Sequence, residues 1–328
     1  MNNFEYRIDG RTELMAIILA LSQCNEYAEE HFVLELEDNY RKDIKKHFLG
    51  FKNHKAICLA KELGQKEEGF CYDTPIRLAF ELNEDYSYSG GLSGFYSNEL
   101  DNLELAKDFL FAVENFAKET NFDNFYKKHK VYYDEKLLQL VDVFSGNIFK
   151  KHLVTFLKRH LSEHFAINII PTLINSNHGF EVSGIFYANL GLPCEDFKTI
   201  APFNGGYAHI IIHEFLHPFV NPLSEKLYYK HKETLLSNIK IEELPKGYQN
   251  KLSFINDTIV RALTIRLREH ISPINTKKFL TLEKSWGFVY VEKIYNEILH
   301  YENQNNSWEE YFEKILTVFE KNMPIDEK

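Results

Sequence analysis

The chain has 328 residues, of which 44% are hydrophobic, 26% charged and 15% aromatic, so it can bury a large core and is not a disordered or low-complexity protein. Its 38 Lys and Arg residues against 48 Asp and Glu residues give a net charge of −10, which disfavours nucleic acid as a partner because a polyanion is bound through basic surfaces. No apolar run approaches the ~18 residues that a membrane-spanning helix needs. The length predicts about two domains.

The apolar segment at 14–21 follows acidic residues and has no basic leader, so it predicts an amphipathic helix rather than a signal peptide. We therefore expect a cytoplasmic protein, or a secreted or periplasmic one if a leader has been removed. The cysteines at 24, 58, 71 and 194 lack the CxxC spacing of a metal or redox site. Cys58 and Cys71 form a disulfide in an oxidising compartment, or all four remain separate thiols.

Residues 1–160 are predicted to form a helical N-terminal subdomain. Apolar residues recur there at three- and four-residue spacing, which is the period of a helix with one buried face. The predicted helices are 13–30, 38–49, 56–63, 75–83, 100–118, 122–144 and 147–164. This half contains no group of residues that indicates catalysis.

The pattern changes near residue 165. Residues 165–174 and 180–190 are rich in β-branched and aromatic residues, and the turn sequence 175–179 separates them, so they predict a β-hairpin. Pro171 indicates that the first strand is an edge strand or contains a bulge, because proline cannot donate to a strand ladder. A third short strand is predicted at 198–203.

Helical periodicity returns after this sheet, with helices predicted at 207–217, 223–239 and 248–271 and two more that end near residue 320. Helices, a small sheet and further helices, in that order, are typical of an α+β protein that is predominantly helical. We expect residues 161–328 to form the second subdomain.

Residues 213–217 form an HExxH motif, His213-Glu214-Phe215-Leu216-His217. Side chains four residues apart share one face of a helix, so both histidines can bind one metal ion, and Glu214 beside the open position can accept a proton from water. The surrounding helix is almost entirely apolar, and burial of these polar groups is unfavourable unless a cation compensates them. The alternative is a buried His–Glu–His hydrogen-bond cluster without metal.

Two neighbours of the motif affect this prediction. His209 lies about two helical turns, or ~12 Å, from His217, so we expect it to be a core histidine or to support a ligand rather than to bind the metal. Pro218 has no N–H to donate to the carbonyl of Glu214, so the helix is predicted to end or kink there.

A catalytic zinc ion needs a third protein ligand, and the downstream helical segment 254–268 is the best source. Asp257 lies in this apolar stretch with Arg261 one turn later, although the two can equally form an ordinary surface ion pair. The other acidic residues that can supply the ligand are Glu225, Glu233, Glu242, Glu243 and Glu269.

The segments HEFLHPFVNPL (213–223) and NDTIVRA (256–262) resemble an uncharacterised bacterial family of unknown function, whose members are regarded as zinc metallopeptidases of the gluzincin type. RTELMAIILALSQCNEY (11–27) and FDNFYKKHKVYYD (122–134) fit the same pattern, so the resemblance covers most of the chain. It implies a zincin-like fold for residues 161–328.

The resemblance also implies a site. It makes His213 and His217 ligands of one Zn²⁺ per chain and Glu214 the general base. The family places a Glu shortly before the Val-Arg-Ala segment as the third ligand, and this chain has Asp257 there. Because aspartate is one methylene shorter, the site must be tighter or the metal more weakly bound.

The implied function is hydrolysis of a peptide or protein substrate, which gluzincin-like enzymes hold along the edge of a small sheet. Tyr207, His178 and Arg261 are candidates to stabilise the transition state. The alternatives are a catalytically inactive binding or scaffold protein, which the aspartate and Pro218 suggest, and a zinc hydrolase of a non-peptide amide or ester. The sequence does not indicate an oligomeric state.

Overall fold

The computed structural model describes residues 4–23, 38–65, 70, 73–97, 100, 102–174, 176–192, 206–239, 244, 245, 248 and 250–320. The chain forms two compact units, each assembled from separate stretches of sequence. Unit 1 consists of Met1–Phe4, Phe144–His164 and Ala201–Lys328, and unit 2 consists of Glu5–Val143 and Phe165–Ile200. Residues 165–200 therefore group with the N-terminal helices, whereas the sequence placed them with the HExxH segment. The reason is that their strands share a sheet with a strand from the N-terminus.

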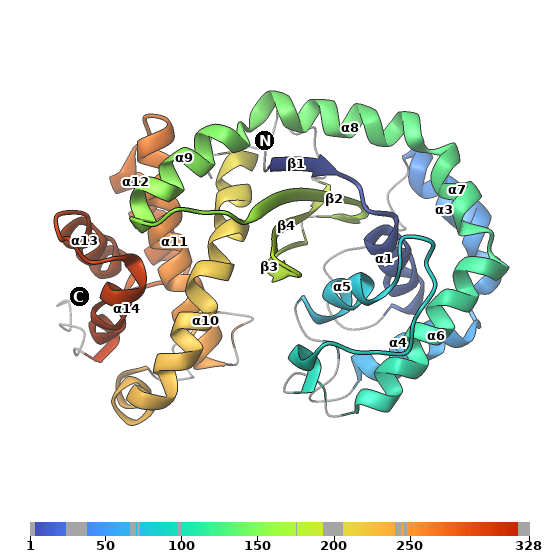
Figure 1. Ribbon diagram of the computed structural model, residues 1–328, viewed down its shortest axis with the longest axis horizontal. Coiled ribbons are helices and arrows are strands. Elements are labelled where there is room, and N and C mark those ends of the chain that lie inside the picture. Colours follow the sequence, from blue (N-terminus) through green and yellow to red (C-terminus); the bar gives the residue numbers. More distant parts are fainter. Residues whose placement is uncertain are drawn as a thin grey trace. The chain divides into compact units, whose positions relative to one another are not determined.

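The helices of unit 2 follow the predicted apolar periodicity (Figure 1). The segment predicted as one helix at 122–144 is two helices, because His129 interrupts it. The α-helices are α1 (Gly10–Ser22), α3 (Asn39–Phe48), α4 (Lys55–Gly64), α5 (Thr74–Leu78), α6 (Leu103–Glu119), α7 (Phe122–Lys128) and α8 (Lys130–Val143). Short 3₁₀ helices η1 (Leu49–Phe51), η2 (Ala79–Glu81) and η3 (Gly94–Ser97) lie between them.

The sheet has four strands in the order β1-β2-β4-β3, which makes β1 and β3 its edges. Their bounds are β1 (Phe4–Arg7), β2 (His164–Ile174), β3 (Asn177–Val182) and β4 (Ile185–Leu192). The prediction of one strand over 180–190 is wrong, because β3 and β4 form an antiparallel hairpin within it. Ser183 and Gly184, both with positive φ, make the two-residue turn, which matches the right-handed twist of paired strands. The strand predicted at 198–203 lies outside the described residues.

Pro171 was expected on an edge strand, but β2 lies between β1 and β4. Because β1 has four residues and β2 has eleven, most of β2 extends past β1 and can accommodate a proline on that side. The carbonyls of Pro171 and Thr172 accept hydrogen bonds from the buried guanidinium of Arg41, at 3.0 and 3.4 Å. Arg41 therefore supplies donors to this part of the strand.

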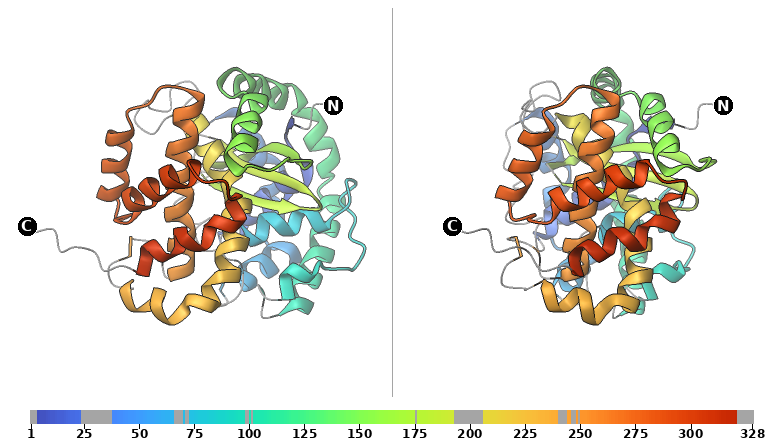
Figure 2. Two further views of the ribbon diagram at one scale, coloured as in Figure 1. Left: turned by 60° about the vertical axis from the view of Figure 1, so that its left-hand side comes forward. Right: turned by 90° about the vertical axis from the view of Figure 1, so that its left-hand side faces the viewer.

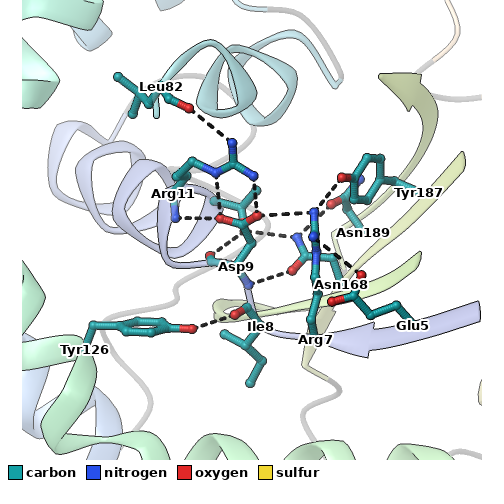
Figure 3. A network of polar contacts seen from close by, with 11 residues as sticks. Glu5, Arg7, Ile8, Asp9, Arg11, Leu82, Tyr126, Asn168, Tyr187 and Asn189 are labelled. Atoms are coloured by element: carbon teal, nitrogen blue, oxygen red, sulfur yellow. Dashed lines mark hydrogen bonds and ion pairs between the residues drawn. The ribbon is translucent and has the colours of Figure 1, made fainter. Parts of the chain in front are cut away.

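A buried polar network connects α1 to the sheet (Figure 3). Asp9 caps α1, and its carboxylate accepts from the backbone N–H and the guanidinium of Arg11. The backbone N–H of Asp9 donates to Asn168 on β2 at 2.8 Å, and the amide of Asn168 donates to Asn189 on β4 at 2.8 Å. Both asparagines are fully buried, so this network fixes α1 in register with two strands of the same unit.

Unit 1 is helical in its described part, and α11 is its central helix (Figure 2). α9, α10, α12 and α13 all pack against α11, and α14 packs against α10 and α13. The bounds are α9 (Gly146–Leu157), α10 (Tyr207–Asn238), α11 (Lys251–Ile271), α12 (Thr276–Ser285), α13 (Val291–Glu302), α14 (Trp308–Leu316) and the 3₁₀ helix η6 (Thr317–Glu320). The fold is thus α+β and predominantly helical, as the sequence predicts.

In the described part of the chain, no helix combines the length and the apolar character needed to cross a bilayer. Cys58 is exposed and its thiol is free. The other three cysteines lie outside the described residues.

Candidate metal centre

The HExxH motif lies near the beginning of α10, in a buried stretch of that helix. Phe215 at the centre of the motif is fully buried and contacts the rings of Phe149 and Phe4, with centroids 5.4 and 5.5 Å away. This packing directs one face of α10 into the core of unit 1. The two histidines and Glu214 lie on other positions of the same helical turn.

The helix was predicted to end or kink at Pro218, and the first alternative is wrong, because α10 continues through Pro218 and Pro222 to Asn238. Each proline removes a single backbone hydrogen bond. The two are four residues apart, so both missing bonds fall on one face of the helix and the remaining bonds are kept. Contacts with α11 and α14 support the helix, including a 3.1 Å hydrogen bond from Trp308 Nε1 to the carbonyl of Phe219.

His213, Glu214 and His217 each direct one ligand atom into a common region, and these atoms lie within 4.8 Å of one another. The Nε2 atoms of the two histidines are 3.2 Å apart, with the rings at 77°. Glu214 is buried, and its Oε2 lies 4.0 Å from Nε2 of His217. On the far side of the His217 ring, Nδ1 lies 3.2 Å from the amide oxygen of Asn221. If Nδ1 donates to that oxygen, Nε2 keeps its lone pair for a metal ion.

Asp257 on α11 adds a carboxylate to the cluster. Its Oδ1 lies 3.0 Å from Nε2 of His213. Its Oδ2 accepts a hydrogen bond from the hydroxyl of Tyr248 and another, 2.7 Å long, from Nε of Arg261. Asp257 is only 7% exposed, so its pair with Arg261 is not an ordinary surface ion pair. One carboxylate oxygen is held in place while the other faces the histidines.

The other candidate ligands differ from Asp257. Glu225 is exposed. Glu269 already accepts from Thr276, Arg266 and Tyr295, at 2.8 Å from Arg266 and 2.5 Å from Tyr295. Glu242, Glu243 and the side chain of Glu233 lie outside what the structure describes. Among the acids whose side chains are described, Asp257 is therefore the one in contact with the motif.

Two spacings among these atoms are close to those around a tetrahedral metal ion. Ligand atoms that each lie ~2.0–2.1 Å from a tetrahedral zinc ion are about 3.3–3.4 Å from one another, by the geometry of the tetrahedron. The distance between the two Nε2 atoms is 3.2 Å, and that from His213 Nε2 to Asp257 Oδ1 is 3.0 Å. Two imidazoles and one carboxylate form the kind of donor set that holds catalytic zinc with one position left open.

The charges at the cluster are strongly coupled. Burial works against the protonated form of His213, but the carboxylate of Asp257 outweighs it, so the pKa of His213 is raised. Burial likewise opposes the ionised form of Asp257, yet Arg261 and then His213 hold the pKa of Asp257 well below its usual range. The carboxylate thus stays ionised and attracts a cation, which is a proton on His213 or a metal ion between them.

Arg261 was predicted as a candidate to stabilise the transition state. In the structure it contacts residues that surround the histidines. Besides Asp257 it binds Glu283 on α12, with Nη1 2.7 Å from Oε2, and its guanidinium lies 3.9 Å from the ring centroid of Phe288. Its role in this geometry is to position Asp257. Sequence reasoning missed Tyr248 and Glu283, since neither has a motif spacing to the ligands, and Asn221, whose i+4 spacing from His217 was a usable signal.

The remaining predicted residues lie at different places. Tyr207 is buried, and burial together with the charge of Glu214 raises its pKa, so its hydroxyl stays protonated near the proposed general base. His209 is buried and stacks on Phe279 with centroids 5.4 Å apart, as expected for a core histidine. His178 lies on β3 in unit 2, where its Nε2 is 3.0 Å from the hydroxyl of Ser176.

One family model matches the sequence, and its description is "Domain of unknown function (DUF4932)". The match extends over residues 5–318, which contain most of both units, the HExxH motif and Asp257. No curated protein and no solved structure matches the chain.

Proposed function

This chain belongs to the DUF4932 family, and we propose that it is a zinc-dependent metallopeptidase whose metal site lies between α10 and α11. The observation that carries the proposal is the approach of Asp257 Oδ1 to within 3.0 Å of His213 Nε2, next to two histidine nitrogens 3.2 Å apart. An HExxH pair and a third ligand from the following helix are the set that a hydrolytic zinc site requires.

When bound at these residues, zinc supplies an acidified water molecule and a Lewis acid for the scissile carbonyl. Glu214, which is buried beside His217, would act as the general base that takes a proton from water and delivers it to the departing amine. Tyr207 keeps its proton, because its pKa is raised, and can donate a hydrogen bond where negative charge develops. The proposed alignment of substrate along a sheet edge stays a prediction, with β1 and β3 as the edge strands.

Metal analysis tests the proposal first. The protein is purified without a metal-affinity tag and its metal content is measured by mass spectrometry. We expect about one zinc ion per chain, lost in His213→Ala and reduced in Asp257→Ala. Absence of metal even after incubation with zinc contradicts the proposal. The cluster would then be a structural ion pair between His213 and Asp257.

Activity separates the enzyme from its alternatives. Glu214→Gln should retain zinc but lower hydrolysis of a peptide library by roughly 10²–10⁴-fold, the usual contribution of a general base. If both forms bind zinc and neither cleaves any peptide, the inactive binding protein is favoured. Cleavage of simple amides or esters but not of peptides favours a hydrolase of non-peptide substrates.

A further inference from the structure

Among the described residues, no partner is found for Arg268 on the central helix of unit 1. Arg268 lies on α11, it is partly buried, and its Nε is fully buried and makes no hydrogen bond. No carboxylate in the described part of the chain forms an ion pair with it. On the same helix, Arg261 and Arg266 each bind two acidic residues. A buried N–H without an acceptor is unfavourable, which suggests that an anion completes this site.

A second unpaired polar group lies near Arg268. Nδ1 of the buried His209 has no hydrogen-bond partner in the described structure. Burial, then the positive charges of His213, Arg268 and Arg261, lower the pKa of His209 to about 3, so its ring is neutral, and its helix α10 packs against α11, which carries Arg268. His209 can therefore donate one neutral hydrogen bond beside the guanidinium.

Helix geometry places both groups on the side of the proposed metal site. Arg268 follows Asp257 by eleven residues, which is close to three whole turns, so the two share a face of α11. Side chains on a helix lean toward its N-terminus, which directs Arg268 back toward Asp257. His209 precedes His213 by one turn, or ~6 Å, on the facing helix.

The position of Arg268 in the last turn of α11 gives a simpler explanation, since carbonyls at a helix C-terminus favour a cation. In the structure, however, the buried Nε of Arg268 makes no hydrogen bond with any of those carbonyls. The dipole of α11 favours a positive charge there but gives the buried Nε no hydrogen-bond acceptor. An anionic ligand would provide that acceptor.

We propose that Arg268, with His209 beside it, binds the C-terminal carboxylate of a peptide substrate, so that the enzyme removes one or two residues from the C-terminus. The proposal rests on the proposed function. An extended peptide advances ~3.3–3.6 Å per residue, so one or two residues span the ~6 Å rise from His213 to His209. Hydrolysis adds water across that bond and releases an amino acid or dipeptide and a peptide shortened by the same number of residues.

The test compares N-acetylated peptides that end in a free carboxylate with the same peptides that end in an amide. We expect cleavage one or two residues from the free C-terminus, and kcat/KM roughly 10–150-fold lower for the amides, the value of one hydrogen bond to a charged group. Arg268→Met should lower kcat/KM for the acids by a similar factor, mainly through KM, and leave the amides unchanged. Arg268→Lys should lie between, because lysine keeps the charge but loses the planar fork.

Lys277→Met on α12 is the matched control, because it removes a positive charge from an exposed position of the same unit. It should retain the preference for acids. Equal cleavage of acids and amides by the unaltered protein, or equal losses on both in Arg268→Met, overturns the inference while the proposed peptidase stands. A purely structural Arg268 also predicts a lower melting temperature in Arg268→Met, whereas we expect no loss because the side chain has no partner.

Binding keeps the two proposals separate. Calorimetry with Glu214→Gln measures the affinity for acetyl-Ala-Ala and for its C-terminal amide without turnover. Tighter binding of the acid, abolished by the additional Arg268→Met change, supports the carboxylate site even if no peptide is cleaved. Equal affinity for the acid and the amide overturns it.

Discussion

Asp257 has two carboxylate oxygens with different roles. Oδ2 is fixed by Arg261 and Tyr248, and Oδ1 faces His213 at 3.0 Å. The close packing of α10 against α11 compensates for the short side chain, because it brings the backbone of Asp257 near the histidines. A glutamate is therefore not needed to reach the site. The groups that hold Oδ2 should then control how well Oδ1 binds metal.

Tyr248→Phe tests whether the groups that hold Oδ2 affect metal binding by Oδ1. The change removes the hydrogen bond to Oδ2 and leaves the ring and its edge-on contact with Phe288 in place. We expect zinc affinity to fall by roughly 10-fold, at the low end of the effect of residues that orient ligands. Competition with a chromophoric chelator measures this affinity. Tyr229→Phe, at an exposed tyrosine of unit 1, is the control and should change nothing.

An unchanged zinc affinity in Tyr248→Phe contradicts the positioning role and leaves Arg261 as the sole anchor among the described residues. Arg261→Gln should have the larger effect, roughly 100-fold, because it removes a charge as well as a hydrogen bond. It also leaves the buried Glu283 without its cation, so its unfolding must be measured in parallel.

At this scale the sequence predicts which residues form the cluster better than it predicts the residues that hold them in place. His213, Glu214 and His217 follow from the spacing of one motif on one helix. Asp257 followed from its place in an apolar helical segment, and the structure brings it to the motif. Tyr248 and Glu283 reach the site only through the packing of separate segments, which no local pattern records.

Among the elements, α10 departs most from what its sequence predicts. Proline inside a helix costs ~3 kcal/mol relative to alanine, and α10 contains two prolines. Pro218 has no N–H, so the backbone carbonyl of Glu214, the proposed general base, lacks its usual helical donor. Packing in unit 1 overrides this local preference, as tertiary contacts often do.

Pro218→Ala should restore the missing hydrogen bond. We expect the free energy of unfolding to rise by roughly 1–2 kcal/mol, since the gain in the helix exceeds the ~0.4–1 kcal/mol of added unfolded-chain entropy. Urea denaturation measures the change. Pro222→Ala, one turn later and exposed, should stabilise by a similar amount without altering zinc affinity. A destabilised Pro218→Ala protein means that α10 is adapted to the proline ring.

In unit 2, the N-terminus of α1 depends on Asp9. Burial opposes its charge, but hydrogen bonds and charge from Arg11 hold its pKa below the usual value. A carboxylate with a depressed folded pKa stabilises the fold above the unfolded pKa of ~3.9, and that stability is lost as pH falls through the folded pKa. Asp9→Asn should therefore lower the free energy of unfolding by roughly 1–3 kcal/mol at pH 7, and the difference should shrink below about pH 4.

Thermal unfolding at pH 7 and at pH 3.5 checks both parts of that prediction. Asp108→Asn is the control, because Asp108 is an exposed aspartate on α6 of the same unit. An Asp9→Asn effect that persists unchanged at low pH means that the size or shape of the side chain matters, and not its charge.

The helices predicted at 38–49 and 56–63 lie close to the bounds of α3 and α4, whereas the helix predicted at 147–164 ends earlier, at Leu157 of α9. Elements whose signal depends on the fold were predicted less well. The helices of unit 2 follow from apolar periodicity alone. The β3–β4 hairpin was missed because Ser183-Gly184 was taken as part of one strand, although a glycine with positive φ is a turn signal. The inner position of β2 depends on β1, which comes from the distant N-terminus.

At the scale of the whole molecule, the chain returns to unit 1 after each of the two stretches that form unit 2. The proposed ligands all belong to unit 1, on α10 and α11. A ligand that binds only the folded state stabilises it by RT ln(1 + [L]/Kd), which is ~2.7 kcal/mol at a free concentration of 100 Kd. Zinc should therefore protect the part of the fold that holds it.

Hydrogen exchange with and without zinc locates that protection. We expect the amides of α10 and α11 to exchange up to roughly 100-fold more slowly with zinc at 100 Kd, because opening these helices requires release of the ion. Residues of α1 and the sheet, which contribute no ligand, should change little. His213→Ala should abolish the protection and Glu214→Gln should keep it, because only the first removes a ligand. Uniform protection of both units means instead that the two open together, and protection of neither contradicts a metal site between α10 and α11.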